Sequence, residues 1–224
     1  MSMRKLGMKK RHRGHRSSGF SLVELMIVVA ITIVLAVVSV VSLVPMMNAQ
    51  RVTNAYNTTL AALRQARDNA VSQRTSYEVV FSQTATPPIQ TTISVLPTTS
   101  GFAGAQNTVT YQYPLGVVFM TPPTSSGTAP DGYGTGSNPI DFGYTSNGNA
   151  GGATSYTIYF CPDGSAQTSS ACSGAGNWDG GVVYLARSGD VGSYRAVSLW
   201  GGTGRIHGWR LYSNGSGGYQ WVRQ

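Results

Sequence analysis

The stretch that decides the fold runs from Phe20 to Val44 and reads FSLVELMIVVAITIVLAVVSVVSLV. It has 25 residues, is followed by Pro45, and contains a single charged side chain, Glu24. As an α-helix it would be roughly 37 Å long at about 1.5 Å per residue, which exceeds the hydrocarbon core of a bilayer at about 30 Å. We therefore expect residues 20–45 to form a membrane-spanning helix.

A strongly basic segment precedes this helix. Residues 1–19 contain seven of the sixteen Lys and Arg residues and none of the eight acids, so nine arginines face eight acids in the remainder. The formal charge of +8 therefore falls to +1 for the body, and it does not by itself indicate a nucleic-acid-binding protein. By the positive-inside rule we expect a cytoplasmic N-terminus and an exported C-terminal part.

An ordinary secretory signal peptide is the alternative interpretation of the same segment. The apolar run is longer than the apolar region of such signals, which has about 7–15 residues, and no A-x-A-like cleavage site follows it. Both observations favour a retained helix.

Glu24 is an unusual residue in such a helix. A carboxylate in the apolar phase costs a few kcal/mol and normally needs a partner, yet no Lys, Arg or His lies between Phe20 and Gln50. Cleavage between Gly19 and Phe20 would create an α-amine with a pKa near 8 four residues from Glu24. That amine would neutralise the carboxylate of its own chain or of a neighbour. The alternative is that Glu24 only reaches the aqueous interface, because it lies five positions into the span.

The segment RSSGFSLVELMIVVAIT, residues 16–32, resembles the class III signal of type IV prepilins and type II secretion pseudopilins. It shares their basic leader, the glycine before the cut, the phenylalanine after it, and the glutamate four residues further on. The resemblance implies that residues 1–19 are a leader removed by prepilin peptidase and that Phe20 is then N-methylated. It also implies that Glu24 docks subunits into a helical filament.

Beyond Pro45 the apolar residues change their spacing. They recur three or four positions apart, as on one face of an amphipathic helix. We therefore expect one helix over residues 20–76, of which residues 46–76 pack on a sheet and Pro45 is a candidate kink. The predicted core face consists of Val52, Tyr56, Leu60, Leu63, Ala66 and Ala70.

Residues 77–224 show short strand-like runs separated by Pro-, Gly- and Ser-rich turns. We predict an α+β fold of the pilin type, with the long helix packed on a mainly antiparallel sheet in an extracytoplasmic domain. The predicted strands are Tyr77–Ser82, Thr92–Leu96, Thr108–Tyr113, Val117–Thr121, Tyr156–Phe160, Val182–Ala186 and Arg195–Leu199.

Two stretches resemble the GspH/FimT family of minor subunits. Leu60–Arg74 with the strand Tyr77–Phe81 looks like that family's passage from helix to sheet, and Tyr194–Leu199 followed by Gly204-Arg205-Ile206 looks like its final hairpin. Residues 84–155 match nothing in the family. The resemblance implies a minor pseudopilin of a type II secretion system, or a minor pilin of a type IV pilus, that primes assembly near the filament tip. Its implied partners are other pilin or pseudopilin subunits, prepilin peptidase and the inner-membrane assembly proteins. Its implied location is first the bacterial inner membrane, with the C-terminal domain in the periplasm, and then the filament.

Cys161 and Cys172 are the two cysteines of the chain. In an oxidising compartment they would close one short loop with a disulfide, worth roughly 3 kcal/mol at most. Free buried thiols are the alternative. A zinc site would need further ligands, and the body offers only His207.

We expect no enzymatic activity, cofactor, metal or small-molecule substrate. His207 is the only histidine of the body, and no serine lies in a G-x-S-x-G elbow. Calcium is the alternative for the acids, but no D-x-D-x-D spacing occurs. Five aspartates stand near Gly and Asn, where this residue type caps turns: Asp131, Asp141, Asp163, Asp179 and Asp190.

DNA binding is the alternative function. Some FimT-like minor pilins bind DNA through basic residues near the terminal hairpin, and Arg205, Arg210 and Arg223 are interleaved here with Trp209, Tyr212, Tyr219 and Trp221. Arginines contact phosphates and aromatic rings stack on bases. Against this, His207 replaces a second basic residue of the family's pattern and no lysine lies in the body.

Overall fold

The computed structural model describes residues 19–98, 108–134, 136–145, 150–172 and 178–224. The predicted leader, apart from Gly19, lies outside the described residues. The chain divides into two compact units, Met1–Val44 and Pro45–Gln224, and each is considered by itself.

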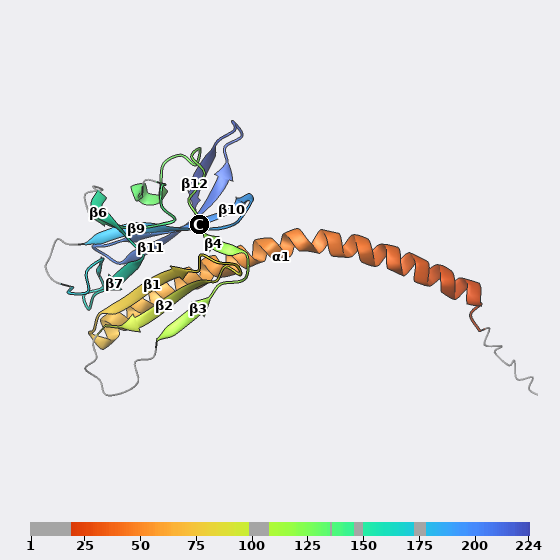
Figure 1. Ribbon diagram of the computed structural model, residues 1–224, viewed down its shortest axis with the longest axis horizontal. Helices are drawn as coiled ribbons and strands as arrows, with labels where there is room; N and C mark the ends of the chain where they lie inside the picture. The colour runs from red at the N-terminus through yellow and green to blue at the C-terminus, as the bar shows by residue number, and fades with distance from the viewer. Residues whose placement is uncertain (1–18, 99–107, 135, 146–149, 173–177) are drawn as a thin grey trace, which may run out of the picture. The chain divides into compact units, whose positions relative to one another are not determined.

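One long helix, α1, comprises Leu22–Gln73 and continues through Pro45 (Figure 1). The prediction of a single helix over residues 20–76 is therefore confirmed to within three residues at either end. Arg74, the residue after the helix, has a φ of +52°. This left-handed conformation is a common way to end a helix, and it leads directly into the first strand.

The N-terminal part of α1, up to Val44, has an exposed apolar surface. The described side chains of residues 20–44 are all exposed, from 47% for Val29 to 81% for Phe20 among the large apolar ones. Within the described ranges, one helix is long and apolar enough to cross a membrane, and this is the segment that qualifies.

The C-terminal part of α1 is amphipathic and lies in the core of the second unit. The six predicted core positions are all buried, with exposed fractions between 0% for Ala66 and 9% for Leu60. The predicted helix face is therefore confirmed.

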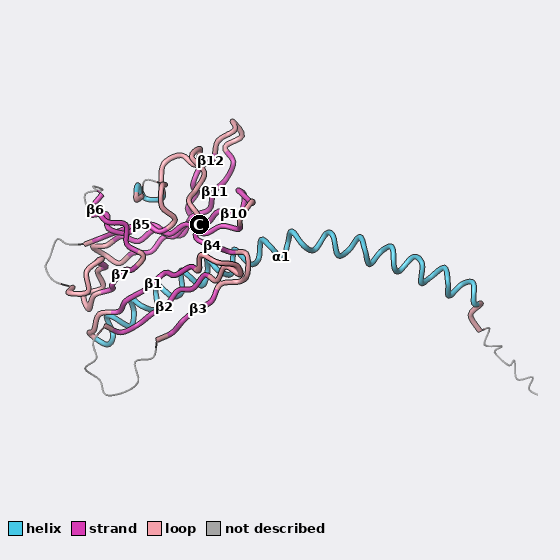
Figure 2. Tube along the Cα trace, in the orientation of Figure 1, coloured by secondary structure: helices cyan, strands magenta, loops and turns pink. Residues whose placement is uncertain are grey.

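The first sheet has five strands, all paired antiparallel, in the order β3-β2-β1-β7-β8 (Figure 2). In β1 and β2 buried and half-exposed residues alternate, as expected for strands that cover a core with one face. The strands are β1 (Tyr77–Gln83), β2 (Thr91–Pro97), β3 (Val109–Gln112), β7 (Thr157–Phe160) and β8 (Ala166–Gln167).

The second sheet is also antiparallel and has the order β12-β11-β10-β9-β5-β6, with β4 paired to β9. A short 3₁₀ turn, η1 (Pro130–Gly132), lies in the loop between β4 and β5. The strands are β4 (Val117–Phe119), β5 (Ile140–Thr145), β6 (Ala150–Ser155), β9 (Asp179–Arg187), β10 (Asp190–Trp200), β11 (Arg205–Ser213) and β12 (Tyr219–Arg223).

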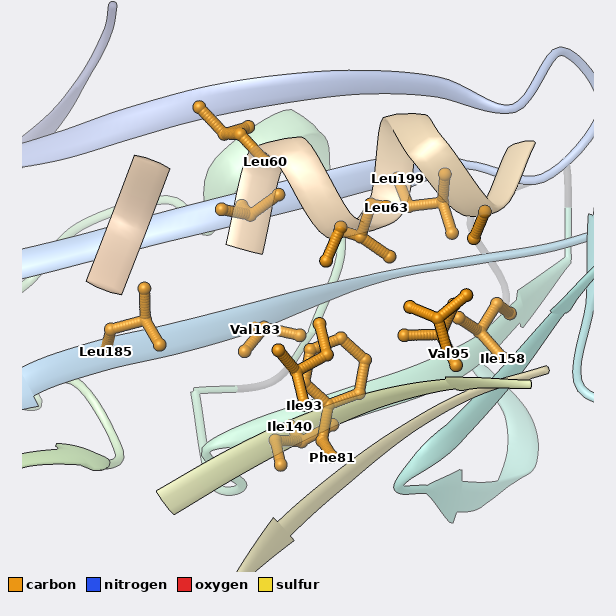
Figure 3. Close-up of a cluster of buried hydrophobic side chains, with 14 of the residues drawn as sticks. Leu60, Leu63, Phe81, Ile93, Val95, Ile140, Ile158, Val183, Leu185 and Leu199 are labelled. Atoms are coloured by element: carbon orange, nitrogen blue, oxygen red, sulfur yellow. The ribbon is translucent and has the colours of Figure 1, made fainter. Parts of the chain in front are cut away.

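The main core joins α1 to both sheets. Figure 3 shows Leu60 and Leu63 of α1 above side chains of β1, β2 and β9. The opposite face of the second sheet carries smaller clusters around Tyr133 and Tyr194, which lie under the loop that contains η1. Strand β9 is therefore buried on both faces, and its residues from Gly180 to Ala186 are all buried.

The α+β class and the antiparallel pairing are confirmed, but two details of the prediction are wrong. The strands form two sheets instead of one, and β12 follows the hairpin of β10 and β11 that we expected to be last. The seven predicted strands are present, and β11 is the second strand of the expected hairpin, whereas β5, β6, β8 and β12 were not predicted.

Candidate functional site

Gly19, Phe20 and Glu24 lie at the start of α1. Phe20 is exposed, and a Cβ built on Gly19 would meet no atom within 4 Å. The carbonyl of Ser21 accepts the N–H of Leu25 at 3.1 Å, so Ser21 caps the helix and Glu24 lies in its first turn. A carboxylate at this position is stabilised by the positive end of the helix dipole.

The Glu24 side chain is exposed, and no described residue donates a hydrogen bond to it or forms an ion pair with it. The spacing of Ser21 and Glu24 is that of a capping box, but the reciprocal side-chain bonds of that motif are not formed between them. The carboxylate is therefore free to meet a charge from outside the described residues.

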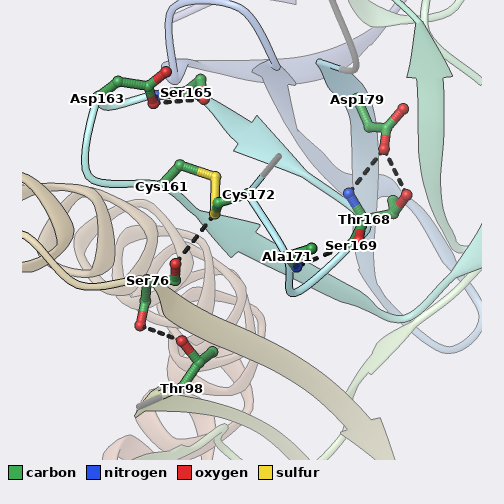
Figure 4. Close-up of a disulfide and its surroundings, with 10 residues drawn as sticks. All are labelled: Ser76, Thr98, Cys161, Asp163, Ser165, Thr168, Ser169, Ala171, Cys172 and Asp179. Carbon is green, nitrogen blue, oxygen red and sulfur yellow. Dashed lines mark hydrogen bonds between the residues drawn. A yellow bond between two sulfur atoms is a disulfide. The ribbon is translucent and has the colours of Figure 1, made fainter. Parts of the chain in front are cut away.

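Cys161 and Cys172 form a disulfide, with their Cα atoms 5.6 Å apart. The hydroxyl of Ser76, at the end of the turn between α1 and β1, donates to the sulfur of Cys172 at 3.2 Å (Figure 4). Asp163 accepts hydrogen bonds from the backbone N–H and the hydroxyl of Ser165. These bonds hold the pKa of the Asp163 carboxyl below its ordinary value, and the bond from the hydroxyl has the larger effect. The loop closed by the disulfide is thus also fixed by hydrogen bonds.

The three arginines predicted to bind DNA do not form one patch. Arg210 lies opposite Val222, and Arg223 lies opposite Trp209. Because successive residues of a strand point to opposite faces, Arg210 and Arg223 lie on different faces of the second sheet. The guanidinium of Arg210 packs over the ring of Tyr212 at 4.9 Å from its centroid.

Arg205 lies apart from both, in a groove of about 460 Å³ next to α1. Gly204 allows the close approach there, since its φ is +57° and a Cβ on it would lie 2.1 Å from the carbonyl oxygen of Gly164. Arg67 donates from Nε to the same oxygen at 3.3 Å. The groove is lined by Arg64, Arg67, Asp68, Thr203, Gly204, Arg205 and Ile206.

Asp131 is part of a hydrogen-bond network that the sequence did not predict. We expected it to cap a turn, but its Oδ2 accepts the hydroxyl of Ser198 and lies 2.8 Å from Nδ1 of His207. Trp209 donates from Nε1 to Ser198 at 2.9 Å. The network fastens η1 to β10 and β11, and His207 is buried in it.

These residue types can form a catalytic triad, but their arrangement here is different. Ser198 and His207 both contact the same carboxylate oxygen, whereas a triad needs the histidine between the serine and the acid. Within the described ranges, no three His, Cys, Asp or Glu side chains converge as metal ligands would. The network holds a loop in place.

Arg195 is a further candidate site residue that was not predicted from the sequence. It is 8% exposed on β10 and lies directly opposite Arg210. Two arginines on neighbouring strands are fifteen positions apart in sequence, so only the pairing of β10 with β11 brings them together.

Comparison of the chain with family models, with curated proteins and with solved structures finds no match.

Proposed function

We propose that this protein is a pilin-like subunit of an extracytoplasmic filament, anchored in the inner membrane by residues 20–44 before assembly. Cleavage after Gly19 releases Phe20 as the new N-terminus, and the body from Pro45 onward lies in the periplasm. The subunit belongs to the minor class of a type II secretion pseudopilus or type IV pilus, and acts in priming assembly. Its partners are other pilin or pseudopilin subunits, prepilin peptidase and the inner-membrane assembly proteins.

The exposed apolar surface around Glu24 is the observation that carries the proposal. A long row of Leu, Ile and Val side chains that is exposed on every described position must be covered by lipid or by other apolar helices. Only one charge interrupts this surface, and it stands in the first helical turn. A purely lipid-embedded anchor has no use for a carboxylate there, whereas a helix that docks on a neighbour's N-terminus does.

The N-terminus supplies the matching charge. Cleavage before Phe20 places an ammonium group four residues from Glu24, and an ion pair in an apolar surrounding is much stronger than one in water. Because each subunit would carry both charges, the amine of one can pair with the carboxylate of the next. This pairing fixes the register between neighbouring helices.

The body fits an exported compartment. Disulfides persist in oxidising compartments such as the periplasm, and the one described cysteine pair is joined. The basic residues of the leader fit a cytoplasmic N-terminus. DNA binding is not favoured as a second function, because the three arginines lie apart and residues 20–224 carry a formal charge of only +1.

The decisive experiment combines protein chemistry with one substitution. Mass spectrometry of the membrane-extracted protein should find Phe20, with a methylated amine, as the first residue. Glu24→Val should insert in the membrane but be at least tenfold depleted from filaments. Thr32→Val is the matched control, since Thr32 is exposed on the same helix and its hydroxyl donates to the carbonyl of Val29 within that helix.

Each result can oppose the proposal. Residues 1–19 still attached in the mature protein would exclude processing. Filament incorporation of Glu24→Val at the level of Thr32→Val would exclude the assembly role of the carboxylate.

A further inference from the structure

Two arginines lie opposite each other on the side of the second sheet that packs on α1: Arg195 is buried and Arg210 is half-buried. Arg195 of β10 and Arg210 of β11 are directly paired. Gly208 shares the face of Arg210, and a Cβ on Gly208 would lie 1.7 Å from the hydroxyl of Tyr56 in α1. This close approach shows that the face carrying both arginines is the one turned toward the helix.

Among the residues that the structure describes, no carboxylate forms an ion pair with either arginine. In the described part of the chain the only ion pair is that of His207 with Asp131. Arg195 donates from Nη1 to the carbonyls of Ser193 and Tyr194, at 3.3 and 3.1 Å, and Nε of Arg210 is buried without any partner. Burial, and then the charge of Arg210, lower the pKa of Arg195, with smaller opposing effects of Tyr212, Tyr56 and Asp190.

This arrangement is unfavourable as it stands. A buried charge that no carboxylate neutralises is costly, and like charges directly opposite on paired strands repel. The ring of Tyr212 below Arg210 offsets part of this through a cation–π contact. An oxyanion that accepts hydrogen bonds from both guanidinium groups, including the unpartnered Nε of Arg210, would reduce both problems, because its negative charge offsets the two positive ones.

We propose that Arg195 and Arg210 form a binding site for a carboxylate supplied by a partner protein. The inference rests on the proposed filament function in one respect, which is that a partner subunit is at hand. A carboxylate is planar and accepts two parallel hydrogen bonds from a guanidinium group, so the side chain of an Asp or Glu suits the half-buried Arg210. A nucleic-acid backbone is disfavoured, because it needs an exposed basic track and residues 20–224 carry a formal charge of only +1.

The site is tested first with a free carboxylate. Full-length protein in non-ionic detergent is unfolded thermally in sodium acetate and in sodium chloride of equal ionic strength. When the acetate concentration is ten times the Kd of acetate for the protein, the midpoint of thermal unfolding should be about 3–6 °C higher than in chloride. Arg210→Gln should lose this rise, and Arg223→Gln, an exposed arginine of β12, should keep it. An equal rise in Arg210→Gln and in the unchanged protein would overturn the site.

The nature of the partner is tested in two further arms. A short single-stranded oligonucleotide should show no binding that depends on Arg210, and binding that Arg210→Gln abolishes would overturn the assignment to a protein carboxylate. In cells that assemble the filament, Arg210→Glu should be processed normally but incorporated at least tenfold less than Arg223→Glu. Equal incorporation of the two variants would overturn the partner role.

A loss of stability in Arg210→Glu is separated from a loss of binding by Arg210→Gln, which removes the charge without reversing it. Incorporation of Arg210→Gln should fall as well, while its melting midpoint in chloride stays at or above that of the unchanged protein, because the repulsion with Arg195 is gone. Processing at Gly19 and the phenotype of Glu24→Val do not involve Arg210. The failure of this site and the failure of the filament proposal therefore give different results.

Discussion

Substituting Gly208 by alanine is expected to weaken the packing of α1 on β11. The new Cβ would lie 1.7 Å from the hydroxyl oxygen and 2.7 Å from Cζ of Tyr56, so the tyrosine must withdraw by more than an ångström from a buried position. Overpacking of a core typically costs about 1–3 kcal/mol, and this contact belongs to the upper part of that range because two atoms clash. At about 2–4 °C per kcal/mol, we expect the melting midpoint to fall by about 4–12 °C.

The assay is thermal unfolding of full-length protein in non-ionic detergent, followed by tryptophan fluorescence. Gly192→Ala is the matched control, since Gly192 is also a strand glycine and its Cβ would meet only Asp190, at 3.5 Å. In a Tyr56→Leu background, Gly208→Ala should cost less than about 1 kcal/mol, because the clashing atoms are absent, and the difference is the coupling between the two positions. If Gly208→Ala is no more destabilising than Gly192→Ala, the described approach of α1 to β11 is wrong.

Three further predictions concern the body. Replacing Cys161 and Cys172 together by serine should lower the free energy of unfolding by up to about 3 kcal/mol in denaturant titrations, and the unchanged protein under reducing conditions should match the variant. Burial, and second the charge of Asp131, raises the pKa of Tyr133 to about 12 from 10.0. The stability tied to the protonated form is complete below pH 10 and is lost as pH rises through 12. The free energy of unfolding of Tyr133→Phe should therefore fall less steeply with pH over that interval than that of the unchanged protein. Asp131→Asn should lower the free energy of unfolding by about 1–3 kcal/mol, because it weakens the bonds that hold η1; a change below about 0.5 kcal/mol would show that this network does not stabilise the loop.

The helix could be predicted from the sequence because its signals are local. The apolar run up to Val44 and the spacing of Val52, Tyr56 and Leu60 each lie in a continuous stretch, so periodicity alone assigns their environment. The same holds for β1 and β2, which alternate between buried and half-exposed residues. The candidate processing residues follow from a contiguous motif for the same reason.

The rest depends on pairings between distant residues. Strands β5 and β6 lie in a Gly- and Asn-rich stretch with little apolar pattern, and β9 does not alternate because both of its faces are covered. Arg205, Arg210 and Arg223 are close along the chain, yet alternation in β11 and β12 puts Arg210 and Arg223 on different faces, and Arg205 lies in the groove next to α1. Arg195 was not predicted as a site residue, because only the register of β10 with β11 brings it next to Arg210.

The burial of β9 on both faces has a consequence for how the body opens. Its backbone is hydrogen-bonded to β10, β5 and β4, and water reaches neither side of the strand. Its amide protons should exchange with deuterated solvent only through global unfolding, whereas those of the outer strand β12 should exchange through local fraying. The end of the chain can thus loosen or rearrange against another molecule while the centre of the body stays intact.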